Sequence, residues 1–217
     1  MNKYSAVIFD FDRTIADTED AVLYCHDQTL RNFGYTPLDK NKFKQVIGKP
    51  ADVQIKFLTG ENDPGLIKKI SDWHTKMCDE HMSEMTKFFP YVKEGLIELQ
   101  KAGIKTGIIS NKNQKYIITP LERDGILPFI NKIYGPEQVK MAKPNPEGLL
   151  RMINEFGLDK REVLYIGDSL IDQAAANNCD VDFAAMLTGG TGQKEFDLNG
   201  SYTAVFNRFC DLINALI

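Results

Sequence analysis

The chain has 217 residues, of which 43% are apolar and 26% are charged, and its formal net charge is −4. This composition is typical of a soluble globular protein, and its mildly acidic balance gives no basic surface for nucleic acid. The apolar runs are too short to span a bilayer, and no small-residue cleavage site follows the first of them. We therefore expect neither a membrane span nor a signal peptide. The scattered cysteines form no CxxC pair and indicate reduced thiols in a cytoplasmic protein.

The N-terminal part of the sequence predicts one strand and then a long helical stretch. The apolar run Tyr4–Phe9 is typical of a strand that is buried on both faces. Residues 17–83 are predicted to be helical, with Asp17 or Thr18 as the first N-cap. Glycine and proline positions should divide this stretch into several helices, and no strand is predicted within it.

From residue 88 onward, predicted helices alternate with predicted strands. Strands are expected over residues 104–109, 131–134, 163–166, 183–187 and 203–206. Helices are expected over residues 92–102, 113–124, 146–156 and 171–178, and again after residue 207. Pro120 should kink or split the second of these helices, and Gly157 should end the third. Asn145 and Asn207 should cap the third and the last.

This alternation predicts an α/β fold, a doubly wound, Rossmann-like parallel sheet with helices on both faces. The helical stretch then becomes an inserted, all-helical domain. We place the core domain in residues 1–15 and 88–217 and the inserted domain in residues 16–87. Ligands of such sheets bind beyond the carboxyl ends of the strands, so functional side chains are expected there.

Two acids, Asp10 and Asp12, end the first predicted strand. Side chains two residues apart on a strand point to the same side, so both carboxylates can face one pocket. Such acids repel each other unless a cation holds them, and Mg²⁺ prefers oxygen ligands. The alternative is a solvated acidic turn, which the fully apolar strand before it makes less favourable.

Three later strand ends carry further polar residues. Ser110 precedes a turn whose amides can bind an anion, or it is a helix-capping serine. Lys143 lies before a predicted helix, either as a point charge for phosphate or as a surface lysine. Asp168 and Asp172 are candidate metal ligands, or acids that satisfy a helix dipole. Together, these residues suit a metal-assisted phosphoryl transfer.

The four motifs in this order resemble the haloacid dehalogenase superfamily of hydrolases over essentially the whole chain. They are DxDxT at 10–14, a serine at 110, Lys-Pro at 143–144 and GDSxxD at 167–172. The insertion at 16–87 lies where one subgroup carries a small helical cap. That subgroup includes phosphoglycolate phosphatase and β-phosphoglucomutase.

The resemblance implies a role for each residue of the first two motifs. Asp10 would be the nucleophile that forms an aspartyl-phosphate. Asp12 would protonate the leaving oxygen and then activate the hydrolytic water. Thr14 would orient this phosphate-binding loop, while Ser110 and the amide of Asn111 would hold the phosphoryl oxygens.

The resemblance also implies a lysine clamp and a Mg²⁺ site. Lys143 would tie the nucleophile to the phosphate and offset its charge. Asp10, the backbone carbonyl of Asp12, and Asp168 would bind Mg²⁺, with Asp172 binding it through water or positioning the loop.

Two cations are candidates for substrate specificity. Arg13 departs from the resemblance, since the family often has glycine there, and its side chain could contact substrate or point to solvent. Lys49, in the segment 47–50, could neutralise a second anionic group, because a glycine-containing cap loop leans over the active site in related enzymes. The alternative for Lys49 is a solvated turn.

The histidines lack metal-ligand spacing and are expected at the surface or in cap packing: His26, His74 and His81.

The activity that the resemblance implies is a Mg²⁺-dependent phosphatase for a small phosphorylated metabolite, with phosphoglycolate-like compounds as first candidates. The acid at Asp12 favours phosphate chemistry, because dehalogenases of the superfamily lack it. A β-phosphoglucomutase-type phosphomutase, a pyrophosphatase and, least favoured, a non-catalytic binding protein are the alternatives. We expect a monomer or weak homodimer, with neither nucleic acid nor membrane as a partner.

Overall fold

The computed structural model describes residues 3–46, 49 and 51–217. The chain divides into two compact units. The sheet unit comprises Met1–Asp17 and Lys87–Ile217, and the helical unit comprises Thr18–Thr86. In the described part of the chain, no helix combines the length and apolar character needed to cross a membrane.

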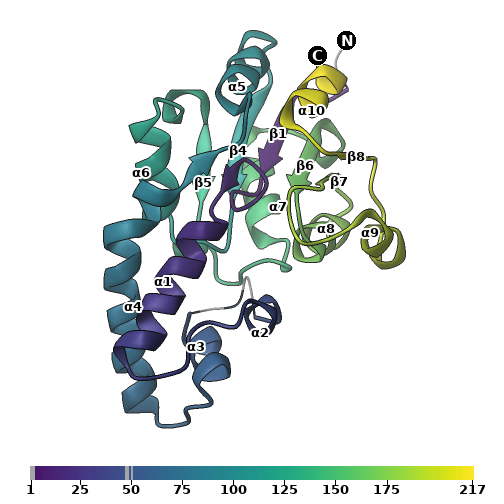
Figure 1. The fold of residues 1–217 in the computed structure, drawn as a ribbon. Helices are drawn as coiled ribbons and strands as arrows, with labels where there is room; N and C mark the ends of the chain where they lie inside the picture. Colours follow the sequence, from purple (N-terminus) through teal and green to yellow (C-terminus); the bar gives the residue numbers. More distant parts are fainter. Residues whose placement is uncertain (1–2, 47–48, 50) are drawn as a thin grey trace. The chain divides into compact units, whose positions relative to one another are not determined.

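The sheet unit contains a six-stranded parallel sheet in the order β5-β4-β1-β6-β7-β8 (Figure 1). This arrangement confirms the predicted doubly wound sheet. The strand bounds are β1 Ala6–Phe9, β4 Lys105–Ile109, β5 Lys132–Tyr134, β6 Val163–Gly167, β7 Asp182–Met186 and β8 Ala204–Phe206.

Apolar residues of the sheet pack into two clusters, one on each face. In β1, Val7 and Phe9 belong to one cluster and Ala6 and Ile8 to the other, which explains the unbroken apolar run. The first face is covered by α5 Val92–Lys101, α6 Lys115–Arg123 and α10 Phe209–Leu216. The second is covered by α7 Glu147–Phe156, α8 Leu170–Asn177 and α9 Gln193–Asn199. Single 3₁₀ turns occupy Leu127–Phe129, Pro136–Gln138 and Lys160–Glu162.

The helical unit consists of α1 Glu19–Asn32, α2 Lys40–Lys44, α3 Ala51–Thr59 and α4 Pro64–Met85. Helix α4 buries residues at a spacing of four, including Ile70, His74 and Cys78, and this stripe packs against α1 (Figure 1). Residues 47, 48 and 50 of the segment that contains Lys49 lie outside the described residues.

Several local predictions were wrong. Residue Asp17 is not a helix cap, because it belongs to a short antiparallel pair of β2 Ala16–Asp17 with β3 Lys87–Phe88. The alternative cap, Thr18, is confirmed as the N-cap residue of α1, although its side chain makes no capping hydrogen bond. Pro120 is buried inside the continuous helix α6, so the predicted split does not occur.

Two predicted caps are displaced by one residue. Asn145 accepts a hydrogen bond from the Glu147 amide at 2.9 Å, yet Pro146 occupies the N-cap position of α7. Arg208, and not Asn207, precedes α10. Gly157 ends α7 with a φ of +68°, as predicted.

Candidate active site

The predicted functional residues of the sheet unit meet at the carboxyl ends of β1, β4 and β6. Asp10 extends β1, because its amide donates to the Ile166 carbonyl at 2.8 Å, and its side chain is nearly buried. Asp12, two residues further, remains one-third exposed. The strand end therefore holds one acid inside the protein and turns the other toward solvent.

Lys143 is the centre of the site. Its Nζ donates to Asp10 Oδ1 at 2.6 Å, to Asp172 Oδ1 at 2.6 Å and to the Tyr165 hydroxyl at 3.0 Å. These three bonds use all the N–H groups of the ammonium. Although burial opposes the charge, the carboxylates of Asp10 and Asp172 hold the pKa of Lys143 well above its ordinary value. Lys143 is therefore held between these carboxylates in an environment that favours its charged form.

Four donors surround the Asp172 carboxylate. Its Oδ1 accepts from Lys143 and, at 2.8 Å, from the Tyr165 hydroxyl. Its Oδ2 accepts from the amide of Ser169 at 3.2 Å and from the Ser169 hydroxyl at 2.5 Å, in a capping box that begins α8. The same residue thus starts the helix and orients the lysine.

Three buried carboxylates, Asp10, Asp168 and Asp172, each offer an oxygen within 4.8 Å of the other two. Lys143 balances only part of this charge. Burial, opposed by Lys143 and assisted by the neighbouring acids, raises the pKa of Asp10 to about 7. Burial, assisted by Asp172 and Asp10, also raises the pKa of Asp168 well above its ordinary value. An all-oxygen donor set with excess negative charge fits a hard divalent cation.

Two glycines leave room for these acids. A Cβ on Gly167 would lie 2.3 Å from the Asp172 Cβ, and a Cβ on Gly189 would lie 1.9 Å from Asp168 Oδ2. Neither distance is possible between unbonded atoms. Side chains at these two positions would displace the acids.

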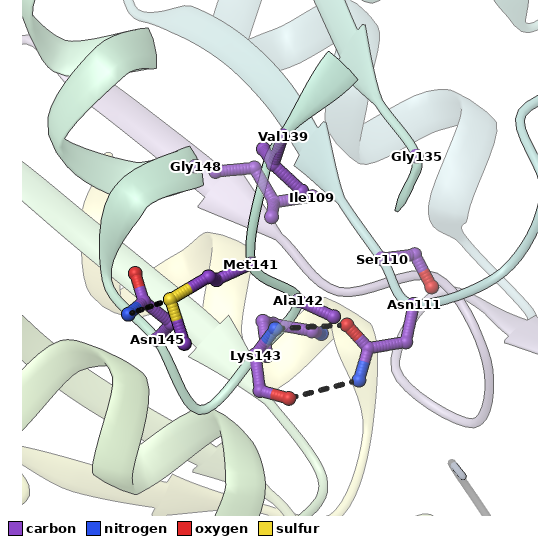
Figure 2. A pocket seen from close by; sticks show the side chains of 10 residues that line it. All are labelled: Ile109, Ser110, Asn111, Gly135, Val139, Met141, Ala142, Lys143, Asn145 and Gly148. Carbon is purple, nitrogen blue, oxygen red and sulfur yellow. Dashed lines mark hydrogen bonds between the residues drawn. The ribbon is translucent and has the colours of Figure 1, made fainter. Parts of the chain in front are cut away.

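Asn111 ties the loop of Lys143 to the end of β4. Its Oδ1 accepts from the Lys143 amide at 3.0 Å, and its Nδ2 donates to the Lys143 carbonyl at 3.1 Å (Figure 2). Ser110 is buried beside it, and the Ser110 hydroxyl accepts from the Lys112 amide at 3.3 Å. The Asn111 side chain is therefore occupied by the loop, while the predicted phosphate contact involves its backbone amide.

The turn after Asp10 has an unusual backbone. Arg13 has a φ of +61°, in the left-handed region that favours glycine. Its amide donates to the Ala16 carbonyl at 2.6 Å, and its carbonyl accepts from the Thr188 hydroxyl. Thr14 is fully buried, and among the described residues its Oγ1 has no hydrogen-bond partner. Arg13 thus keeps the backbone shape of a glycine turn while carrying a cation.

Sequence reasoning missed three residues of this site. In the sequence, Tyr165 is indistinguishable from the other core residues of its strand. The signal that could have found it is that a buried tyrosine needs a hydrogen-bond partner for its hydroxyl. Ser169 was included in the GDSxxD motif without a role of its own, and Lys112 was assigned no role. Lys112 Nζ lies 2.9 Å from Asp12 Oδ1.

The two predicted specificity residues are Arg13 and Lys49. Unlike Arg13, Lys49 belongs to the helical unit, and it is exposed.

Comparisons with known proteins identify the family of the chain. The family described as haloacid dehalogenase-like hydrolase matches residues 7–186. A phosphoglycolate phosphatase from Vibrio cholerae is 27% identical and covers 82% of each chain. An N-acetylmuramic acid 6-phosphate phosphatase from Pseudomonas aeruginosa is 25% identical over 86% of this chain and 83% of its own.

A solved structure from Bacteroides fragilis, described as a haloacid dehalogenase-like hydrolase, shares 33% identity with this chain. The match has a TM-score of 0.89 and covers 97% of this chain and 100% of that one. The resemblance stated from the motifs is confirmed, and the chain belongs to the haloacid dehalogenase-like hydrolase family.

Proposed function

We propose that the protein is a Mg²⁺-dependent phosphatase that hydrolyses a small phosphorylated metabolite through an aspartyl-phosphate. The observation that carries this proposal is the clamp of Lys143 on Asp10, 2.6 Å away, beside two further buried acids. A carboxylate held this way presents its other oxygen as a nucleophile. The names of the two curated relatives, both phosphatases, support the same reaction class.

The proposed reaction has two steps. Asp10 attacks phosphorus, the bond to the leaving oxygen breaks, and that oxygen takes a proton from Asp12. Asp12 then removes a proton from water, whose oxygen attacks the phosphorus and releases Asp10 and inorganic phosphate. Ser110 and the Asn111 amide hold the phosphoryl oxygens throughout, and Lys143 offsets their charge.

We assign the metal to Asp10, Asp168 and the backbone carbonyl of Asp12. When bound, Mg²⁺ offsets the charge of the phosphate and of the surrounding carboxylates. Because four donors already occupy the Asp172 oxygens, we assign that residue to positioning Lys143. The helical unit is the proposed cap, with Lys49 as a candidate contact to an anionic substrate.

The test is phosphate release from a panel of phosphorylated metabolites, with Mg²⁺ and with EDTA. We expect release that needs Mg²⁺ and that disappears in Asp10→Asn. Hydroxylamine should trap an acyl phosphate in the wild type, and trapped enzyme should accumulate in Asp12→Asn because water is no longer activated. Release by pure Asp10→Asn protein would rule out this mechanism. No release from any compound would favour a phosphomutase or a binding protein.

A further inference from the structure

Lys112 is the second nearly buried lysine of the site. Its side chain is only 7% exposed, and it follows the Ser110–Asn111 pair at the end of β4. We propose that Lys112 is a specificity residue that binds a negatively charged group, above all a carboxylate, on the leaving-group side of the substrate. The inference rests on the proposed phosphatase function and adds a residue that selects among phosphate esters.

The contacts of the two lysines differ. Lys143 has three partners at fixed positions, whereas the Lys112 ammonium, in the described part of the chain, contacts only the Asp12 carboxylate, at 2.9 Å. An ammonium can donate three hydrogen bonds. Lys112 therefore keeps donor capacity that its present contacts do not use.

The place of Lys112 follows from the role of Asp12. Asp12 is assigned to the leaving oxygen, so a cation 2.9 Å from Asp12 Oδ1 lies on the leaving-group side of the site. The Asp12 side chain is 33% exposed, which leaves a path from solvent to this pair. An acid on the carbon next to the ester oxygen would reach the ammonium.

Replacing the Asp12 carboxylate by a substrate carboxylate as the partner of Lys112 should cost little free energy. An arriving carboxylate offers Lys112 the same charge and the same kind of oxygen that Asp12 offers now. The flexible stem of lysine allows the ammonium to contact both carboxylates at once or to move between them. A neutral leaving group offers no such partner, so the difference should appear as selectivity between charged and neutral esters.

The experiment compares phosphoglycolate with phosphoglycolamide, which has nearly the same shape but no carboxylate charge. For the wild type with Mg²⁺, we expect kcat/KM to be higher for the acid by about tenfold to a hundredfold. Lys112→Met should lose this preference while still hydrolysing the amide, and Lys112→Arg should keep much of it. The matched control is Lys140→Met, because Lys140 is an exposed lysine whose charge acts on Glu147 and not on Asp12.

The outcomes separate the two proposals. Equal hydrolysis of both esters by the wild type would overturn the role of Lys112 and leave the phosphatase function standing, and this comparison needs no variant to fold. A Lys112→Met enzyme that loses the same factor on both esters would also overturn it, since Lys112 would then only position Asp12. No hydrolysis of either ester, with the metabolite panel also negative, would remove both proposals.

Discussion

The two units bury polar groups of different kinds. The site of the sheet unit buries an ammonium among three carboxylates. The helical unit buries imidazole, thiol and hydroxyl groups, and within its described part no Asp, Glu, Lys or Arg is buried. There, His74 Nδ1 lies 3.0 Å from the Thr29 hydroxyl and His74 Nε2 lies 3.4 Å from the Cys78 thiol.

This difference distinguishes a candidate active site from buried polar groups that only stabilise a fold. Uncharged polar groups that bond to one another inside a helical pair need no further partner. Buried carboxylates in excess of their cations are costly, and such an arrangement is stable only with a proton or a metal ion to compensate it. Charge imbalance, and not burial of polar groups as such, distinguishes the candidate site from the polar core of the helical unit.

Loss of the central cation should have the largest effect. Lys143→Met leaves Asp10 and Asp172 without their buried partner, so we expect the free energy of unfolding to fall by about 3–5 kcal/mol. Phosphatase kcat should fall about a thousandfold. Urea denaturation and phosphate release measure the two effects. Lys140→Met, at an exposed position, should change stability by less than about 0.5 kcal/mol. Equal stability of the two variants would contradict the charge argument.

The next largest effect should come from a methyl group at Gly167. Because its Cβ would lie 2.3 Å from the Asp172 Cβ, Gly167→Ala should cost about 2–3 kcal/mol of stability. Displacement of Asp172, and with it Lys143, should lower kcat about a hundredfold. Gly190→Ala is the matched control, since no heavy atom lies within 4 Å of its added Cβ. Full activity of Gly167→Ala would show that Asp172 has no role in positioning Lys143.

The polar core of the helical unit should show a smaller cost and no catalytic effect. Thr29→Val removes the hydroxyl that bonds to the Cys25 carbonyl at 2.6 Å and to His74, so stability should fall by about 1–2 kcal/mol. Thr75→Val is the control, because Thr75 is exposed and its hydroxyl likewise bonds four residues back. We expect kcat of both variants to match the wild type below their unfolding transitions. A large loss of kcat in Thr29→Val would place catalytic function in this cluster.

Much of this comparison could be predicted from the sequence, for a physical reason. The strand β1 is a continuous apolar run, and Asp10 directly follows it, while Asp168 directly follows β6. The local sequence pattern therefore indicates both the buried strands and the acids at their ends. Helix α9 was missed because Phe196 is its only buried residue and no periodicity results. The Lys112–Asp12 pair joins residues 100 positions apart, and no local pattern reports it.

Metal binding should depend on pH because of the Asp10 carboxyl. Burial raises its pKa to about 7, above the ordinary value of 3.8. In the metal-free protein, this shift contributes stability that is present below pH 4 and is lost as pH rises through 7. Mg²⁺ would have to displace the proton, so its affinity should rise about fivefold between pH 6 and pH 7 and level off above about pH 8.

Calorimetry in two buffers of different ionisation enthalpy measures both the affinity and the protons released. The titrations use the protein without substrate. Asp10→Asn should release fewer protons than the wild type at pH 7. Equal proton release by the two proteins would mean that Asp10 is already ionised before Mg²⁺ binds.

The smallest expected effect concerns the turn at Arg13. Its φ of +61° places a β-carbon in the left-handed region, which costs most residues about 1 kcal/mol relative to glycine. Because Arg13→Gly and Arg13→Ala both remove the guanidinium, the difference between them isolates this strain. We expect Arg13→Gly to be the more stable by about 1 kcal/mol in urea denaturation, less the greater entropy of glycine in the unfolded chain. If the two variants unfold at the same urea concentration, the turn relaxes without cost, and an arginine at this position needs no compensating role in the site. A clear difference would mean that this loop accepts a strained residue near Asp10, the proposed nucleophile, as expected where the side chain itself is used.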